Sequence, residues 1–180
     1  MNKSPFYTGK GDRGDTTRLE GKGRIAKDSA AIETLGALDE AACAVGAARA
    51  RMQNPQRQAE LRIVQQHLSR LMAHVSATPE SRTRHAGVGE FEIEWLEQQI
   101  AALEEGLPPL KAFVLPGDTS SDAACHIARA TVRRAERRLV TLCTHEPHIE
   151  TTNLAYLNRL SAYLYILALR ESPRTDPSQA

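Results

Sequence analysis

The stretch Arg129-Ala130-Thr131-Val132-Arg133-Arg134-Ala135-Glu136-Arg137-Arg138 decides the fold of this chain, because it predicts a long central helix. On a helix, Arg129, Arg133 and Arg137 recur at every fourth position and share one face, with Glu136 beside them. An apolar stripe occupies the adjoining face, formed by Ala128, Val132, Ala135, Leu139 and Leu142. The arginines are therefore predicted to stand at the edge of a packed surface.

Guanidinium groups at such an edge suit a multiply charged anion, because each can give two parallel hydrogen bonds to phosphate or carboxylate. A solvated charged face with intrahelical ion pairs explains the stretch equally well when it is taken alone. A helix that binds nucleic acid through residues 133–138 is a further interpretation. The net charge of +1 for the whole chain disfavours it, since a general nucleic-acid binder carries a large basic excess.

Helical periodicity on both sides of this stretch predicts five helices in all. The first helix is expected to begin at Asp28 or Ser29 and to end before Asn54-Pro55, and the second to run from there to Thr78-Pro79. The third is expected from about Gly89 to Glu105. The fourth is capped by Asp118, Thr119 or Ser120 and reaches about Thr144, and the fifth spans about Asn153 to Glu171. In the third helix we expect Phe91, Trp95 and Leu96 to face inward. Residues 79–87 are expected to form a loop, and no segment shows sustained two-residue alternation. The predicted fold class is all-α, a five-helix bundle.

A length of 180 residues suits one domain with a substantial core. We expect an N-terminal loop over residues 1–28, the bundle over 29–171 and a flexible tail over 172–180. No apolar run approaches the roughly 20 residues of a membrane span. The cysteines Cys43, Cys125 and Cys143 are interpreted as small buried residues of a reducing cytoplasm rather than as a disulfide framework. We expect a cytoplasmic protein that binds neither membrane nor nucleic acid.

Residues His145-Glu146-Pro147-His148 bring two histidines close together in sequence. Their spacing differs from that of a helical zinc pair, and the proline breaks any helix there. We therefore predict no resident metal site on the protein.

The N-terminal loop reads Thr8-Gly9-Lys10-Gly11-Asp12-Arg13-Gly14-Asp15-Thr16-Thr17 and is followed by Lys27. Glycines let the backbone turn its N–H groups toward one point, while lysine adds charge and threonine adds hydroxyl donors, as in a phosphate cradle. The spacing is not that of a Walker A loop, and no strand is predicted before it. A flexible glycine-rich tail is the alternative.

Three further side chains allow both a functional and a structural interpretation. Asp39 lies on or beside the core-facing stripe of its helix and would need an arginine partner if buried, or else sits at the bundle edge. Asn158 lies inside a strong helix and could bind a ligand or a neighbouring helix. Phe113 precedes a proline turn, where it could serve as ordinary core filler.

Taken together, these segments resemble the PduO-type corrinoid adenosyltransferases over nearly the whole chain. The resemblance is carried by Thr8 to Gly14, Thr16-Thr17, Lys27, Gly36-Ala37-Leu38-Asp39-Glu40, Phe113-Val114-Leu115-Pro116-Gly117, Arg129, Arg133 to Arg137, and Tyr156 to Ser161. It implies a five-helix bundle assembled as a homotrimer, with ATP between neighbouring subunits. It also implies transfer of the 5′-deoxyadenosyl group of ATP to Co(I) of a reduced corrinoid, cob(I)alamin, giving adenosylcobalamin and triphosphate.

The resemblance further implies a role for each matching residue. Thr8, Gly9, Lys10, Gly11, Thr16, Thr17 and Lys27 would hold the triphosphate, and Arg133, Arg134, Glu136, Arg137 and Asn158 would contact the nucleotide. Arg129 would pair with Asp39 and help to seat the corrin, and Phe113 would crowd the lower face of cobalt. Mg²⁺ is expected through the ATP phosphates. A reductase and a cobalamin-dependent acceptor enzyme are the expected transient partners.

Five positions depart from the family pattern, namely Ala42, Asp118, Ala162, Tyr165 and Asp15. The last of these adds a negative charge inside the expected phosphate loop. The departures leave open a second function, a non-catalytic bundle that binds ATP or a corrinoid as a carrier or sensor.

Overall fold

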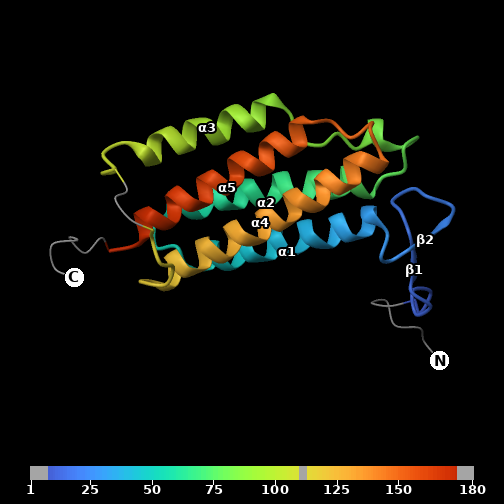
Figure 1. Ribbon diagram of the computed structural model, residues 1–180, viewed down its shortest axis with the longest axis horizontal. Helices are drawn as coiled ribbons and strands as arrows, with labels where there is room; N and C mark the ends of the chain where they lie inside the picture. The colour runs from blue at the N-terminus through green and yellow to red at the C-terminus, as the bar shows by residue number, and fades with distance from the viewer. Residues whose placement is uncertain (1–7, 110–112, 174–180) are drawn as a thin grey trace.

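Five helices lie side by side along one long axis in the computed structural model, which describes residues 8–109 and 113–173 (Figure 1). They are α1 (Ala30–Arg51), α2 (Pro55–Ser76), α3 (Glu90–Glu104), α4 (Ser120–His145) and α5 (Thr152–Glu171). Helix α4 packs against both α1 and α5, while α2 packs on α1 and α3 on α5. The predicted five-helix bundle is confirmed, and the arginine-rich stretch lies in its central helix.

The chain is not wholly α-helical. Two short strands, β1 (Asp15–Thr17) and β2 (Arg24–Ala26), pair antiparallel with Thr16 opposite Ile25. A 3₁₀ turn, η1 (Arg82–Arg84), lies within the segment expected to be a loop. Each strand has three residues, which is too short to show the two-residue alternation by which strands are recognised.

The core confirms the predicted stripes with two corrections. Phe91 is 76% exposed, whereas Ile93 and Leu96 are buried. Phe91 lies two positions before Ile93, about 200° around the helix, so it points away from α5. The second correction concerns the cysteines, because Cys43 is exposed although Cys125 is buried.

A largely buried ion-pair cluster fastens the N-terminal segment to the bundle. Arg18, which lies between β1 and β2, bonds Glu146 at 2.6 Å and the carbonyl of Ala77 at 2.7 Å. Arg82 of η1 bonds the same carboxylate from the other side. Burial alone would raise the pKa of Glu146, but the two guanidinium groups outweigh it and lower this pKa.

Because of these contacts, the described part of the N-terminal segment is a loop packed against the bundle and not a detached glycine-rich tail. The backbone N–H of Leu19 also donates to Ser76 at the end of α2, at 2.8 Å. Of the expected C-terminal tail, residues 174–180 lie outside the described residues. None of the described helices is long and apolar enough to cross a membrane.

Candidate functional site

The N-terminal loop forms a small cradle in which Lys27 lies over a glycine. Gly9 and Gly14 adopt φ angles of +69° and +80°, a region that favours glycine. The ammonium nitrogen of Lys27 lies 3.1 Å from the point where a side chain at Gly11 would begin. The N–H of Lys27 donates to the carbonyl of Gly14 at 2.9 Å, which closes the cradle. A positive charge and turned backbone are thereby held together, as an anion site requires.

The negative charge of Asp15 is matched within the same hairpin. Arg24 Nε donates to the Asp15 carboxylate at 2.9 Å, and Nη2 donates to the Asp15 carbonyl at 2.9 Å. The hydrogen bond from Arg24 holds the pKa of Asp15 below its ordinary value. The cradle therefore tolerates this departure from the family pattern, because Asp15 is paired with Arg24 and does not neutralise the charge of Lys27. Thr8, Lys10, Thr17 and Lys27 are exposed around it, and Thr16 is half-buried.

The arginines of α4 divide into paired and unpaired groups. Arg134 bonds Glu40 of α1, and Arg138 lies 3.6 Å from Glu33 of the same helix. Arg133 and Arg137 are exposed and form no ion pair with any residue the structure describes. The predicted one-face arrangement thus leaves two adjacent guanidinium groups available for an anion.

Glu136 and Asn158 meet where α4 packs against α5. The Asn158 amide donates to the Glu136 carboxylate at 3.3 Å, and its oxygen accepts from Arg159 at 3.1 Å. Asn158 is exposed, so this contact orients the amide without removing it from a ligand's reach. The structure brings together two of the residues that were predicted to contact the nucleotide.

A hollow of about 350 Å³ lies between the segment before α4 and the helices α4 and α5. It is lined by Phe113, Val114, Pro116, His126, Arg129, Arg133, Ser161, Ala162 and Tyr165. Phe113 is 86% exposed at its rim, so it is not core filler. The guanidinium carbon of Arg129 lies 5.8 Å from the ring centre of Tyr165.

Four residues of this hollow were given no site role in the sequence analysis, although helical spacing places them beside residues that were. His126 precedes Arg129 by three positions and Arg133 by seven, which places it on the same side of α4. On α5, Ser161, Ala162 and Tyr165 follow Asn158 by three, four and seven positions. Two of the departures from the family pattern therefore lie in one hollow.

The segment that carries Phe113 is tied at its far end to the last helix. Gly117, with φ of +120°, takes the left-handed position of the turn, so the following Asp118 adopts an ordinary conformation. The Asp118 carboxylate accepts from the Ser172 hydroxyl at 2.7 Å, and the Thr119 hydroxyl donates to the carbonyl of Glu171 at 3.1 Å. The departure at Asp118 thus adds a contact.

The single chain does not join all the predicted residues. The cradle lies at the end of the bundle where α1 begins, and the segment before α4 lies at the opposite end (Figure 1). Asp39 is exposed on α1, and no ion pair links it to Arg129 within the described chain. Their pairing remains a prediction that a single chain does not test.

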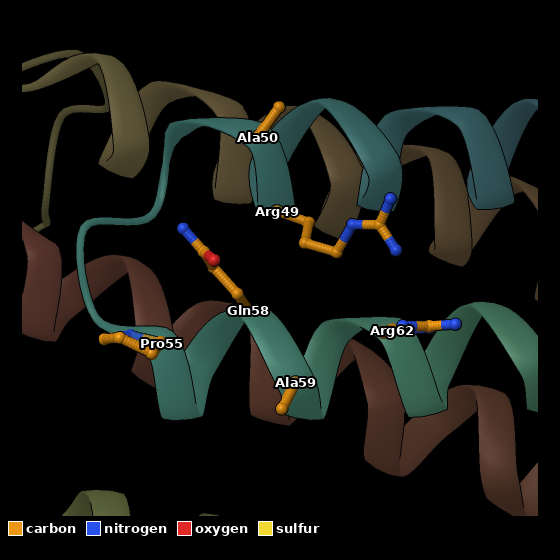
Figure 2. Close-up of a pocket in the computed structure, with 6 residues that line it drawn as sticks. All are labelled: Arg49, Ala50, Pro55, Gln58, Ala59 and Arg62. Atoms are coloured by element: carbon orange, nitrogen blue, oxygen red, sulfur yellow. The ribbon is translucent and has the colours of Figure 1, made fainter.

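Another cavity, of about 660 Å³, lies between the end of α1 and the start of α2 (Figure 2). Arg49 and Arg62 extend into it from the two helices, with Gln58 nearer the connecting turn (Figure 2). None of the residues predicted for the site lines it. We place the candidate site at the smaller hollow, because that is where α4, α5 and the Phe113 segment converge.

The described residues thus form a helical bundle that carries an anion cradle at one end, a hollow rimmed by the exposed Phe113 ring, and two arginines of α4 that have no ion-pair partner among them. The cobalamin adenosyltransferase family matches residues 6–171. The chain belongs to this family.

Curated relatives and solved structures agree with this assignment. The corrinoid adenosyltransferase PduO of Citrobacter freundii is 37% identical over 92% of this chain and 49% of its own length. The corrinoid adenosyltransferase of Mycobacterium tuberculosis strain H37Rv is 37% identical over 95% of this chain and 90% of its own. A variant PduO-type ATP:corrinoid adenosyltransferase from Lactobacillus reuteri, complexed with cobalamin and ATP, has a TM-score of 0.78, 32% identity, and coverage of 90% of this chain and 88% of that one. The chain spans about half the length of the PduO relatives it matches.

Proposed function

We propose that this protein transfers the 5′-deoxyadenosyl group of ATP to Co(I) of a reduced corrinoid. The electron pair of Co(I) forms the bond to the 5′ carbon, the bond from that carbon to the phosphate oxygen breaks, and triphosphate leaves with the bonding electrons. Cobalt rises formally from Co(I) to Co(III). The observation that carries the proposal is the single hollow that joins Phe113, Arg129 and Arg133, beside the Glu136–Asn158 contact.

The chemistry needs no protein base or nucleophile, because the metal of the substrate is itself the nucleophile. The protein must align cobalt with the 5′ carbon and stabilise the charge that develops on triphosphate. In our proposal the cradle with Lys27 holds the triphosphate and Arg133 and Arg137 bind the nucleotide phosphates. Arg134, Glu136 and Asn158 fix the remainder of the nucleotide.

Phe113 has a different role in the proposed reaction. An exposed apolar ring below cobalt occupies the place of a lower axial ligand and keeps water away. A four-coordinate Co(II) state is thereby stabilised, which makes reduction to Co(I) easier.

The active unit in this proposal is a homotrimer with its nucleotide sites between subunits. It is supported by the separation, within one chain, of the cradle from the segment before α4 that lines the hollow, since the two lie at opposite ends of the bundle (Figure 1). A neighbouring copy would supply the missing half of each site and an Asp39 partner for Arg129. Mg²⁺ fits the cradle as an ion carried by the phosphates, since the Asp15 carboxylate is already paired with Arg24 and the threonine hydroxyls remain.

The deciding experiment mixes the purified protein with Mg-ATP and chemically reduced cobalamin and follows the visible spectrum. We expect the spectrum of a light-sensitive alkylcobalamin, with release of triphosphate. Calorimetric uptake of ATP without any alkylcobalamin under saturating substrates would favour the carrier or sensor instead. No uptake of ATP by the assembled protein would remove the adenosyltransferase and every ATP-binding alternative.

We further propose that the reaction takes place in the cytoplasm, where a reductase supplies electrons and a cobalamin-dependent enzyme accepts the product. Adenosylcobalamin is light-sensitive, so direct transfer to an acceptor enzyme suits its chemistry.

A further inference from the structure

The first turn of α4 holds the Phe113 segment through one buried carboxylate. Asp122 is 1% exposed, and its Oδ2 accepts from the backbone N–H groups of Gly117 at 3.0 Å and Asp118 at 2.9 Å. The Thr119 hydroxyl caps the helix by accepting from the N–H of Asp122 at 3.0 Å. The segment that carries Phe113 is therefore fixed to α4 at its C-terminal end.

One turn along the same helix, His126 faces the hollow and is 6% exposed. Its Nε2 lies 3.3 Å from the second oxygen of Asp122, and its ring meets the edge of Tyr165 with centres 5.8 Å apart. These contacts fix the orientation of the imidazole. Burial lowers the pKa of His126, so the ring is neutral near pH 7 and offers one donor and one acceptor.

Neither ring nitrogen of His126 makes a well-formed hydrogen bond within the described chain. Nε of Arg129, in the same hollow, is also buried without a partner. The Ser161 hydroxyl, by contrast, already donates to the carbonyl of Asn158 at 2.9 Å. Buried polar groups without partners are costly and uncommon, so this part of the hollow calls for a ligand group.

A primary carboxamide is the group that these atoms complement. Its oxygen accepts from a donor such as Arg129 Nε, and its NH₂ donates to the free nitrogen of a neutral imidazole. A carboxylate has no hydrogen to donate to an imidazole acceptor, and an apolar group would leave both the His126 nitrogen and Arg129 Nε without a partner. Cobalamin carries primary carboxamides around the edge of its ring.

We propose that His126, oriented by Asp122, is a specificity-determining residue that hydrogen-bonds a peripheral carboxamide of the corrin substrate. The inference rests on the proposed function, because it assigns a contact within the same corrin site. It adds a residue for which neither the sequence patterns nor the comparisons give a role.

The test is a His126→Phe variant, which keeps the ring and its edge contact with Tyr165 but removes both nitrogens. We expect the Kd for cob(II)alamin, measured by spectroscopic titration with Mg-ATP present, to rise about three- to tenfold, the size of one hydrogen bond. The KM for ATP should stay within about twofold of wild type if the loss is confined to the corrin. His126→Gln, which keeps a donor and an acceptor, should recover most of the affinity.

His67→Phe is the matched control. His67 also meets aromatic edges, those of Trp95 and Tyr156, and bonds the Tyr156 hydroxyl at 3.1 Å, but it lies outside the hollow. This variant should lose stability and keep the wild-type Kd for cob(II)alamin. If His126→Phe does not fold, His126→Gln compared with His126→Leu makes the same contrast.

The binding measurement separates the two claims. Equal cob(II)alamin affinity in wild type and the nitrogen-free variant would overturn the role of His126, whatever the turnover. A wild-type protein that binds cob(II)alamin without forming adenosylcobalamin would overturn the proposed function alone, and one that binds no corrin would overturn both.

Discussion

Replacing Glu146 by glutamine should loosen the N-terminal segment from the bundle. The carboxylate is 18% exposed and lies between Arg18 and Arg82, whose side chains are 12% and 6% exposed. Removing one partner of a buried charge cluster costs about 3–5 kcal/mol, because the remaining charges stay buried without compensation. The glutamine oxygen still accepts one guanidinium N–H, so we expect a loss of about 2–3 kcal/mol. That loss corresponds to a fall in Tm of about 4–12 °C for a chain of this size.

Urea unfolding measures the loss, and calorimetry with Mg-ATP measures its effect on the cradle that Arg18 helps to position. Glu20→Gln is the matched control, because Glu20 also joins the N-terminal segment to η1, through Arg84, but in an exposed pair. Exposed pairs contribute about 0–1 kcal/mol, so this variant should unfold almost as the wild type does. Equal losses in the two variants would refute the reasoning that burial makes the Glu146 cluster the anchor.

Three further outcomes follow from the site and its ionisable groups. Arg133→Ala should lower turnover about 10²- to 10³-fold with assembly intact, as when one group that stabilises transition-state charge is lost; wild-type turnover would remove Arg133 from the site. Asp39→Ala should weaken corrin use, seen as a higher corrin KM, while unfolding shifts by less than about 0.5 kcal/mol because Asp39 is exposed; unfolding of the variant would instead indicate a structural ion pair. On acidification, stability should fall below about pH 6.5, since the buried His74 and His126 have lowered pKa values and the unfolded chain takes up protons first. It should fall again below about pH 4.5, because the pKa of Glu146 is lowered in the folded protein and the unfolded chain therefore takes up this proton first. A urea midpoint that is flat from about pH 7.5 to 4 would contradict both.

The helices could be predicted because their apolar stripes are long and their ends carry clear signals. Asn54-Pro55 begins α2 and Thr119 caps α4 as the sequence indicates. The error at Phe91 has a simple cause: α3 carries one apolar series with Phe91 and Trp95 and another with Ile93 and Leu96. Because α3 packs on α5 along one side, a single helix cannot bury both series.

The charged anchors could not be predicted, because their partners lie far apart in sequence. Arg82 lies in a segment whose composition predicts a loop, and Glu146 stands between two histidines in the sequence. Their contact spans 64 positions, and that of Arg18 with Glu146 spans 128. Periodicity carries no information on such pairings. The arginines of α4 could be predicted as a group by contrast, because residues three or four positions apart on one helix lie on the same face.

The ties from Asp118 and Thr119 to Ser172 and Glu171 have a practical consequence for handling this protein. A shortened chain that stops at Arg170 would lose both hydrogen bonds and would hold the Phe113 segment through Asp122 without the support of α5. Expression vectors should therefore retain the sequence through residue 173, and any affinity tag or fluorescent fusion joined beyond it needs a spacer. A cleavable linker would keep such an addition from pulling on the last turn of α5.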